Sequence, residues 1–177
     1  GMNPMALTAK IDDRFGNGKI TARIGLDLHA ETFAADTDVY GLVQKAHEDK
    51  KVDAVLIDEA QFLTPEQVMQ CARIVDDLGI PVMCYGLKTD FMGKLFPGSE
   101  ALLRFADNLE EIKTICWCGR KATHTARVTS KGDVVREGAQ IAIGGNDMYV
   151  SLCRKHFMRG EPAAQKSAEN TKDKAAA

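Results

Sequence analysis

Three cysteines and one histidine near the C-terminal end form the pattern that most constrains how this chain can fold. Cys116 and Cys118 are separated by one residue, and after a long segment Cys153 and His156 follow as C-x-x-H. Thiolates with one imidazole suit zinc, and four protein ligands make a closed, structural site. The pattern therefore predicts a metal that ties the two ends of one segment together. The alternative is a set of buried or exposed thiols without a metal.

The size and composition of the chain are those of an ordinary folded protein. It has 177 residues, of which 45% are hydrophobic and 27% charged, which suits one domain with a small appendage and predicts little disorder. The net charge of −2 and the absence of a dense Lys/Arg stripe argue against nucleic acid as a partner.

No apolar run approaches the roughly 20 residues that span a bilayer, and the first residues lack the layout of a signal peptide. These features predict no membrane association and a cytoplasmic location. Five cysteines are present, and an odd number with three in the metal pattern favours reduced thiols over disulfides. The other two, Cys71 and Cys84, lie in apolar surroundings and are interpreted as small core residues.

A strand, a helix and a second strand follow one another in the middle of the chain. Residues 52–57 and 80–85 are short apolar runs that predict buried strands. Between them Thr64 can cap a helix that runs to about residue 78, since Pro65 suits its first position and Gln67 completes a capping box. Such a crossover is right-handed, so the sheet is parallel and the fold class is α/β.

The remaining elements are predicted from apolar spacing and turn residues. The first 115 residues are expected to form the α/β core, 116–157 a small zinc-containing, β-rich C-terminal domain, and 158–177 a disordered tail. Further strands are expected at 5–11, 125–128, 134–136 and 140–143, further helices at 39–49 and 99–108, and a polar loop at 12–18.

The residues that could perform chemistry follow the central strands. Asp58 and Glu59 end an apolar strand as in a Walker B motif, where the Asp holds magnesium and the next carboxylate can accept a proton. The alternative is a solvated acidic strand end. Leu87, Phe91 and Phe96 follow the next strand and could wall a pocket, although the two phenylalanines could equally belong to the core.

Four blocks of the sequence carry a resemblance to a known family. They are Ile57 to Leu63 (IDEAQFL), Cys84 to Phe91 (CYGLKTDF), Lys113 to Ala122 (KTICWCGRKA) and Ile143 to His156 (IGGNDMYVSLCRKH). In this order they resemble bacterial thymidine kinase of the zinc-containing type with a P-loop/RecA-like core. The resemblance extends over about residues 1–157.

The resemblance implies an enzyme of nucleotide salvage for DNA synthesis. Such an enzyme transfers the γ-phosphoryl group of ATP to the 5′-hydroxyl of thymidine or deoxyuridine. Glu59 matches the family's general base, and Asp58 would help to hold the Mg²⁺ that accompanies ATP. Arg14 matches an arginine near the transferred phosphate, where the alternative is a surface loop arginine.

The resemblance also implies a nucleoside pocket and a role for zinc. The zinc would anchor a lasso that closes over the base and binds it largely through backbone groups. The residues that match pocket positions are Leu87, Phe91, Phe96, Thr125, Tyr149, Gly144 and Gly145. The two glycines would let the main chain approach a flat base, and the alternative for them is a plain turn between strands.

The sequence departs from the family in one respect. No G-x-x-x-x-G-K-S/T motif occurs, and the family has this phosphate loop within roughly 30 residues that would precede Gly1. The chain as given is therefore expected to have little or no kinase activity. The alternatives are a nucleoside-binding protein without kinase activity and a zinc module for protein contacts. Family members are homotetramers inhibited by thymidine triphosphate, so the resemblance implies both properties here.

Overall fold

The structure is a computed structural model that describes residues 1–10, 19–21, 27–140 and 148–163. The chain divides into two compact units. The first unit comprises residues 1–89 and 95–110, and the second comprises 90–94 and 111–177. The proposed domain boundaries at 115 and 157 stay predictions.

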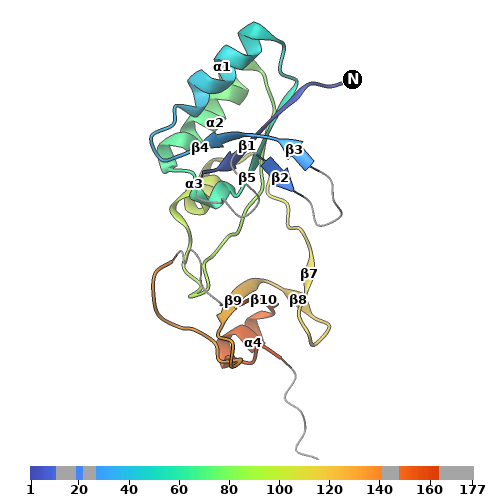
Figure 1. Ribbon diagram of the computed structural model, residues 1–177, viewed down its shortest axis with the longest axis vertical. Coiled ribbons are helices and arrows are strands. Elements are labelled where there is room, and N and C mark those ends of the chain that lie inside the picture. Colours follow the sequence, from blue (N-terminus) through green and yellow to red (C-terminus); the bar gives the residue numbers. More distant parts are fainter. Residues whose placement is uncertain (11–18, 22–26, 141–147, 164–177) are drawn as a thin grey trace, which may run out of the picture. The chain divides into compact units, whose positions relative to one another are not determined.

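A four-stranded parallel sheet forms the centre of the first unit (Figure 1). Its order is β4 (Glu31–Phe33), β1 (Pro4–Ala9), β5 (Ala54–Asp58) and β6 (Val82–Cys84). The predicted parallel sheet and α/β class are confirmed, and three of these strands overlap the predicted ones. A separate antiparallel pair is formed by β2 (Lys19–Thr21) and β3 (Asp27–His29), and the sequence analysis predicted neither these two nor β4.

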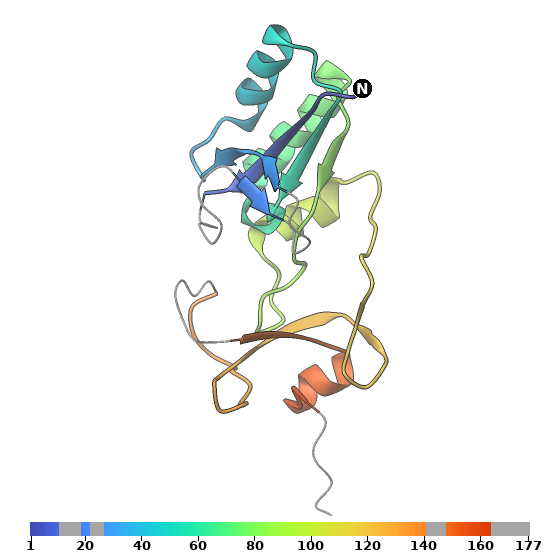
Figure 2. The same ribbon diagram turned by 45° about the vertical axis from the view of Figure 1, so that its right-hand side comes forward.

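Two helices cover one face of the sheet, namely α1 (Val39–Asp49) and α2 (Pro65–Leu78) (Figure 2). The side chains that alternate along β1 and β5 on this face are buried against them, since period-two alternation sends every second residue to the same side. The buried core residues include Leu7, Ala9, Val55, Ile57, Val43, Val68, Cys71 and Ile74. Cys71 lies within this core and Cys84 packs against it, as the sequence analysis predicts.

The start of α2 shows why the sequence signals at this point are reliable. The Thr64 side chain accepts from the backbone amide of Gln67, and the Gln67 side chain accepts from that of Thr64. Gln67 is buried, and its amide also donates to the carbonyls of Ala34 and Thr37. The capping box therefore both begins the helix and attaches it to the loop before α1.

The helix α3 (Pro97–Phe105) is shifted relative to the predicted range 99–108. Pro97 occupies its first turn, where a missing N–H is tolerated, and Ala106 has extended backbone that ends it. The helix packs against α2 and against a short 3-10 helix, η1 (Ala60–Phe62), which directly follows β5.

The second unit is small and mostly β. It contains the pairs β7 (Thr114–Ile115) with β8 (Lys121–Ala122) and β9 (His124–Val128) with β10 (Met148–Leu152), and then α4 (Arg154–Arg159). The predicted strand at 134–136 is wrong, because only Val134 forms a bridge, to Val128. The predicted strand at 140–143 falls mainly on residues outside the described ranges. No pattern in the sequence predicts β10 or α4.

The β9–β10 hairpin has two different faces. Directly opposed residues of an antiparallel pair point to the same side, so Thr125 with Ser151 and Arg127 with Tyr149 share one face. The other face carries Ala126 and Leu152, which are fully buried in the second unit's own core. That core also contains Cys116, Cys153 and Phe157. The face that carries Thr125 and Tyr149 is therefore opposite to the face that meets the cysteines.

Candidate functional site

Asp58 and Glu59 lie at the carboxyl end of β5, where ligands of open parallel sheets bind. Glu59 has φ of 53°, the only left-handed conformation among the non-glycine residues that the structure describes. Holding a residue there costs about 1–3 kcal/mol and is common at functional sites. The Glu59 amide donates to the Asp58 carboxylate at 3.0 Å. The chain thus turns sharply at Glu59 directly after the strand.

Gln61 connects this turn to the segment after β6. Its side-chain Nε2 donates to the Glu59 carboxylate at 2.5 Å, and its Oε1 accepts from the Leu87 amide at 3.1 Å. The Gln61 side chain is buried. The side-chain amide of Gln61 therefore holds both the carboxylate of Glu59 and the main chain of Leu87, and both of these residues are predicted site residues.

Two glycines allow these segments to approach each other. A Cβ on Gly86 would lie 2.5 Å from the Gln61 side-chain oxygen and 3.0 Å from its backbone nitrogen. A Cβ on Gly98 would lie 2.5 Å from the carbonyl oxygen of Leu63 and 2.8 Å from that of Gln61. Contacts that short do not occur for real Cβ atoms. The packing around η1 therefore requires glycine at both positions.

Leu87 and Phe96 are the other predicted site residues in the first unit. Leu87 is exposed, and its carbonyl accepts from the Ser99 hydroxyl at 2.7 Å. Phe96 is buried, and its ring meets the Phe62 ring edge to face at 5.8 Å. Phe96 therefore belongs to the packing beneath η1, and Leu87 offers an apolar side chain to solvent beside the Glu59 turn.

Cys116, Cys118, Cys153 and His156 converge in the second unit. Their ligand atoms all lie within 4.8 Å of one another, and all but Cys118 are buried. The Cys118 and Cys153 sulfurs are 3.9 Å apart, and the Cys116 sulfur lies 3.4 Å from His156 Nδ1. A tetrahedral zinc with bonds of about 2.3 Å to sulfur separates its ligands by about 3.8 Å. The spacing and the donor set fit a zinc ion held by these four residues.

Hydrogen bonds prepare one of these sulfurs for metal binding. Burial raises the pKa of the Cys116 thiol, but hydrogen bonds from the backbone of Cys118 and Cys153 and from His156 outweigh it and lower the pKa to about 6. A zinc ligand must be a thiolate. The lowered pKa therefore favours the thiolate form of Cys116 that zinc requires.

The second coordination layer holds the histidine in place. The Trp117 ring stacks on the His156 ring at 4.1 Å, and Trp117 Nε1 donates to the Glu161 carbonyl at 3.0 Å. The Glu161 carboxylate lies 3.7 Å from His156 Nε2, the nitrogen that points away from Cys116. An acidic partner on that side favours the tautomer that leaves Nδ1 free for a metal.

The second unit also holds three of the predicted nucleoside residues. Thr125 and Tyr149 lie on one face of the β9–β10 hairpin. Phe91, in the 90–94 segment, is buried beneath Arg127, which also lies on that face. The structure therefore places Thr125, Tyr149 and Phe91 around Arg127, a residue that the sequence analysis did not single out.

Three predicted site residues, Arg14, Gly144 and Gly145, lie outside the described residues. Two further residues contact predicted site residues but were not predicted from the sequence, namely Gln61 and Arg127. Gln61 could have been found as a polar residue inside the apolar stretch after Glu59. Arg127 could have been found as a charged residue that alternates with Ala126 and Val128 in a strand and so shares a face with Thr125.

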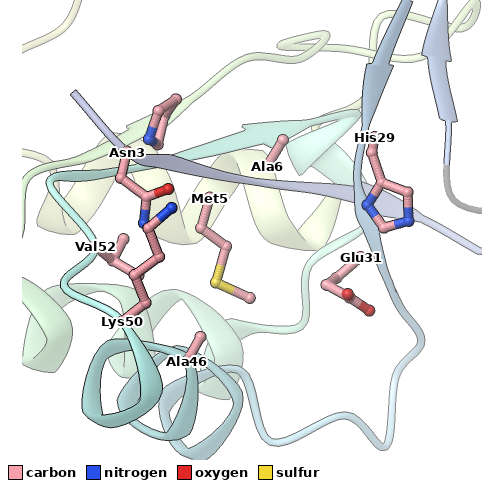
Figure 3. Close-up of a pocket in the computed structure, with 9 residues that line it drawn as sticks. Asn3, Met5, Ala6, His29, Glu31, Ala46, Lys50 and Val52 are labelled. Carbon is pink, nitrogen blue, oxygen red and sulfur yellow. The ribbon is translucent and has the colours of Figure 1, made fainter. Parts of the chain in front are cut away.

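A cavity of about 240 Å³ lies elsewhere in the first unit (Figure 3). Its lining comes from β1, from the residues around β3 and β4, and from the end of α1, and includes Met5, His29, Glu31 and Lys50. None of the predicted site residues lines it. Within the described parts of the chain, no helix has the length and apolar character needed to cross a membrane.

Comparisons with known proteins identify the family to which the sequence is similar. A family model described as thymidine kinase matches residues 1–157. The thymidine kinase of Vibrio cholerae is 55% identical over 157 residues, which cover 89% of this chain and 82% of the relative. That of Shewanella oneidensis is 52% identical with the same coverage. That of Haemophilus influenzae is 53% identical over 156 residues, 88% of this chain and 81% of the relative.

Proposed function

This chain belongs to the thymidine kinase family, and from that premise we propose that it transfers the γ-phosphoryl group of ATP to the 5′-hydroxyl of thymidine or deoxyuridine. The observation that carries the assignment of roles is the Glu59 turn, where a residue with strained backbone directly follows a central strand and shares the Gln61 amide with Leu87. Transfer of this kind depends on positioning and on a base for the hydroxyl proton.

Glu59 is the general base in this proposal. Its carboxylate accepts the proton of the 5′-hydroxyl as that oxygen attacks the phosphorus, and it must come within about 3 Å of the hydroxyl to do so. Gln61 donates to the carboxylate and fixes its orientation. Asp58 lies one residue earlier at the strand end and helps to hold the Mg²⁺ that neutralises charge on the phosphates.

Membership of the family assigns nucleoside binding to the residues that match its pocket and lasso, namely Leu87, Phe91, Phe96, Thr125 and Tyr149. Of these, Leu87 is exposed and Phe96 is buried against Phe62. Gly144 and Gly145 let the lasso backbone approach the base, and Arg14 stabilises charge on the transferred phosphate. Zinc bound by the four ligands supplies a fixed anchor for the two ends of the lasso.

The family supports four further properties of this chain. We infer that it works as a homotetramer in the cytoplasm, in nucleotide salvage for DNA synthesis. Thymidine triphosphate, the end product of that salvage, would inhibit it by occupying the nucleoside site. Sedimentation of the purified protein tests the assembly, and inhibition that competes with thymidine tests the feedback.

The test of the function is phosphoryl transfer from radiolabelled ATP by the intact gene product. Thymidine and deoxyuridine should each yield a labelled monophosphate in the presence of Mg²⁺, and cytidine should not. A Glu59→Gln variant that retains its zinc serves as the control for contaminating kinases. Absence of labelled thymidine monophosphate with fully folded, zinc-loaded protein would contradict the proposal.

A further inference from the structure

Arg127 lies buried at the centre of the hairpin face that carries Thr125 and Tyr149. It is in β9 directly opposite Tyr149, and only 6% of the residue is exposed. Arginine is rarely buried unless its charge and its N–H groups are used. The contacts of Arg127 therefore show what this position requires.

The first contact is with Phe91. The guanidinium carbon of Arg127 lies 3.8 Å from the centre of the Phe91 ring, and Phe91 is itself 2% exposed. A planar cation over an aromatic face is attracted by the ring quadrupole, and the attraction is stronger when both partners are removed from water. One face of the Phe91 ring is thus covered and oriented by Arg127.

The second contact is with the segment between β9 and β10, which the zinc ligands enclose. Arg127 Nη1 donates to the Ala139 carbonyl at 3.3 Å, and Nη2 donates to the Glu137 carbonyl at 3.4 Å. Gly138 lies between them with φ of 127°, and a Cβ there would lie 2.9 Å from Nη2. The positive φ therefore favours glycine here, and a Cβ at this position would displace the guanidinium.

A separate tie joins the same two segments. The buried Asp90 carboxylate accepts from the amides of Met92 and Lys94 through Oδ1, and from Gln140 Nε2 through Oδ2 at 3.0 Å. The 90–94 segment is therefore attached to the 137–140 segment at two points. One is Asp90 with Gln140, and the other is Phe91 with Arg127.

We propose that Arg127 is a positioning residue of the nucleoside site, which orders Phe91 and the 137–140 segment before the nucleoside binds. This inference rests on the proposed function, since Phe91, Thr125 and Tyr149 are nucleoside residues only if that function is right. A site formed in advance avoids the ordering cost that binding otherwise includes. Loss of Arg127 therefore weakens nucleoside binding and leaves phosphoryl transfer, which depends on Glu59, nearly unchanged.

The experiment compares Arg127→Lys and Arg127→Met with Arg154→Lys, an exposed arginine of α4. Lysine keeps the charge but has neither the planar stacking surface nor the fork that reaches two carbonyls. Both Arg127 variants should raise the KM for thymidine about tenfold. Their kcat, their KM for ATP and their zinc content should stay within about twofold of the wild type, as should all parameters of the control.

A wild-type KM in Arg127→Lys would overturn the proposal, because charge alone would then suffice. A tenfold loss in kcat at unchanged KM would also overturn it, since Arg127 would then be a catalytic residue. Variants that no longer fold or hold zinc would overturn it as well, since Arg127 would then be a purely structural residue. Failure of the intact wild-type gene product to phosphorylate thymidine, while folded and loaded with zinc, would instead contradict the proposed function.

A double-mutant cycle tests whether Arg127 acts through Phe91. Phe91→Leu keeps an apolar side chain of similar reach and removes the ring that the guanidinium covers. If Arg127 orders that ring, adding Arg127→Lys to Phe91→Leu should raise the KM for thymidine by clearly less than it does in the wild type. Additive effects on KM would contradict the proposed coupling.

Discussion

The side-chain amide of Gln61 donates a hydrogen bond to the carboxylate of Glu59. Gln61 is 2% exposed, and its other end is fixed by the Leu87 amide. Water therefore has little access to this amide, and the position of the carboxylate depends on the loop after β6. A charged acceptor held by a buried donor loses rotational freedom, as a proton acceptor in a phosphoryl transfer site requires.

Gln61→Ala should lower kcat for thymidine about tenfold, because a hydrogen bond to a charged group contributes about 1.5 kcal/mol or more. Its KM for thymidine should change less. Gln44→Ala, at an exposed position of α1, is the matched control. Steady-state kinetics at equal zinc content distinguish the two, and a kcat for Gln61→Ala equal to that of the control would refute the positioning role.

Glu59→Gln should remove the proton acceptor with little change in shape. The expected loss in kcat is about 10²- to 10⁴-fold, which is the usual contribution of a general base, while thymidine should still bind in calorimetry. Glu48→Gln, exposed on α1, controls for the charge change. Retention of more than half of the wild-type kcat by Glu59→Gln would exclude Glu59 as the base.

The sequence predicts the first unit better than the second for physical reasons. The capping box at Thr64 and Gln67 is a local signal, so α2 is predicted at its true bounds. The strand β10 is stabilised by its pairing with β9, which is distant in sequence, and tertiary context decides such strands more than propensity does. The two-residue pair β7–β8 is too short to leave a clear pattern.

The site residues, too, are predictable only where a local sequence pattern determines them. The metal ligands are predictable because their types and spacing follow from coordination chemistry, and the structure brings all four together. The alternation of β9 could place Arg127 on the face of Thr125, but it could not predict the contacts of Arg127 with Phe91 and with the carbonyls of residues 137 and 139, because no local pattern connects these groups. The role of the buried Phe96 was ambiguous in the sequence, because phenylalanine occurs both in pocket walls and in hydrophobic cores.

Gly98→Ala should displace η1 and with it the Glu59 turn. The new Cβ would lie within 3 Å of three carbonyl oxygens, those of Ala60, Gln61 and Leu63, and relief of such crowding costs about 1–3 kcal/mol. Thermal unfolding should show a lower midpoint, and kcat should fall as well. Gly132→Ala is the control for backbone strain without crowding. The φ of Gly132 is 90°, but an added Cβ there meets nothing within 4 Å. Equal kcat values for the two variants would contradict this prediction.

Cys153→Ser should abolish stoichiometric zinc binding and weaken thymidine binding, since the lasso would lose the metal that holds its ends. Zinc content by atomic absorption and thymidine affinity by calorimetry measure the two effects. Cys84→Ser, a half-buried cysteine of β6 outside the metal cluster, is the control. Unchanged thymidine affinity in a zinc-free variant would contradict the anchoring role.

The fluorescence of Trp117 provides a direct signal for zinc binding. Trp117 is the single tryptophan of the chain and stacks on His156, so metal binding at His156 should change its emission. Titration of the metal-free protein with zinc should therefore give a fluorescence change that saturates at one equivalent. That change should be absent in Cys153→Ser, and a change that persists there would mean that Trp117 reports some other event.

Removal of zinc should reveal a thiol that ionises near neutral pH. Hydrogen bonds lower the pKa of Cys116 to about 6 in the folded protein, whereas an ordinary thiol ionises near pH 8.5. The pKa of this thiol is lower in the folded protein than in the unfolded chain, so ionisation of the thiol stabilises the metal-free fold. This stabilisation is complete at pH values above the ordinary pKa, and it is lost as the pH falls toward about 6. Ultraviolet absorbance of the thiolate should rise with a midpoint near pH 6, and Cys116→Ser should lack that step. A first midpoint above pH 8 in the wild-type protein would show that the backbone amides do not activate this sulfur for zinc.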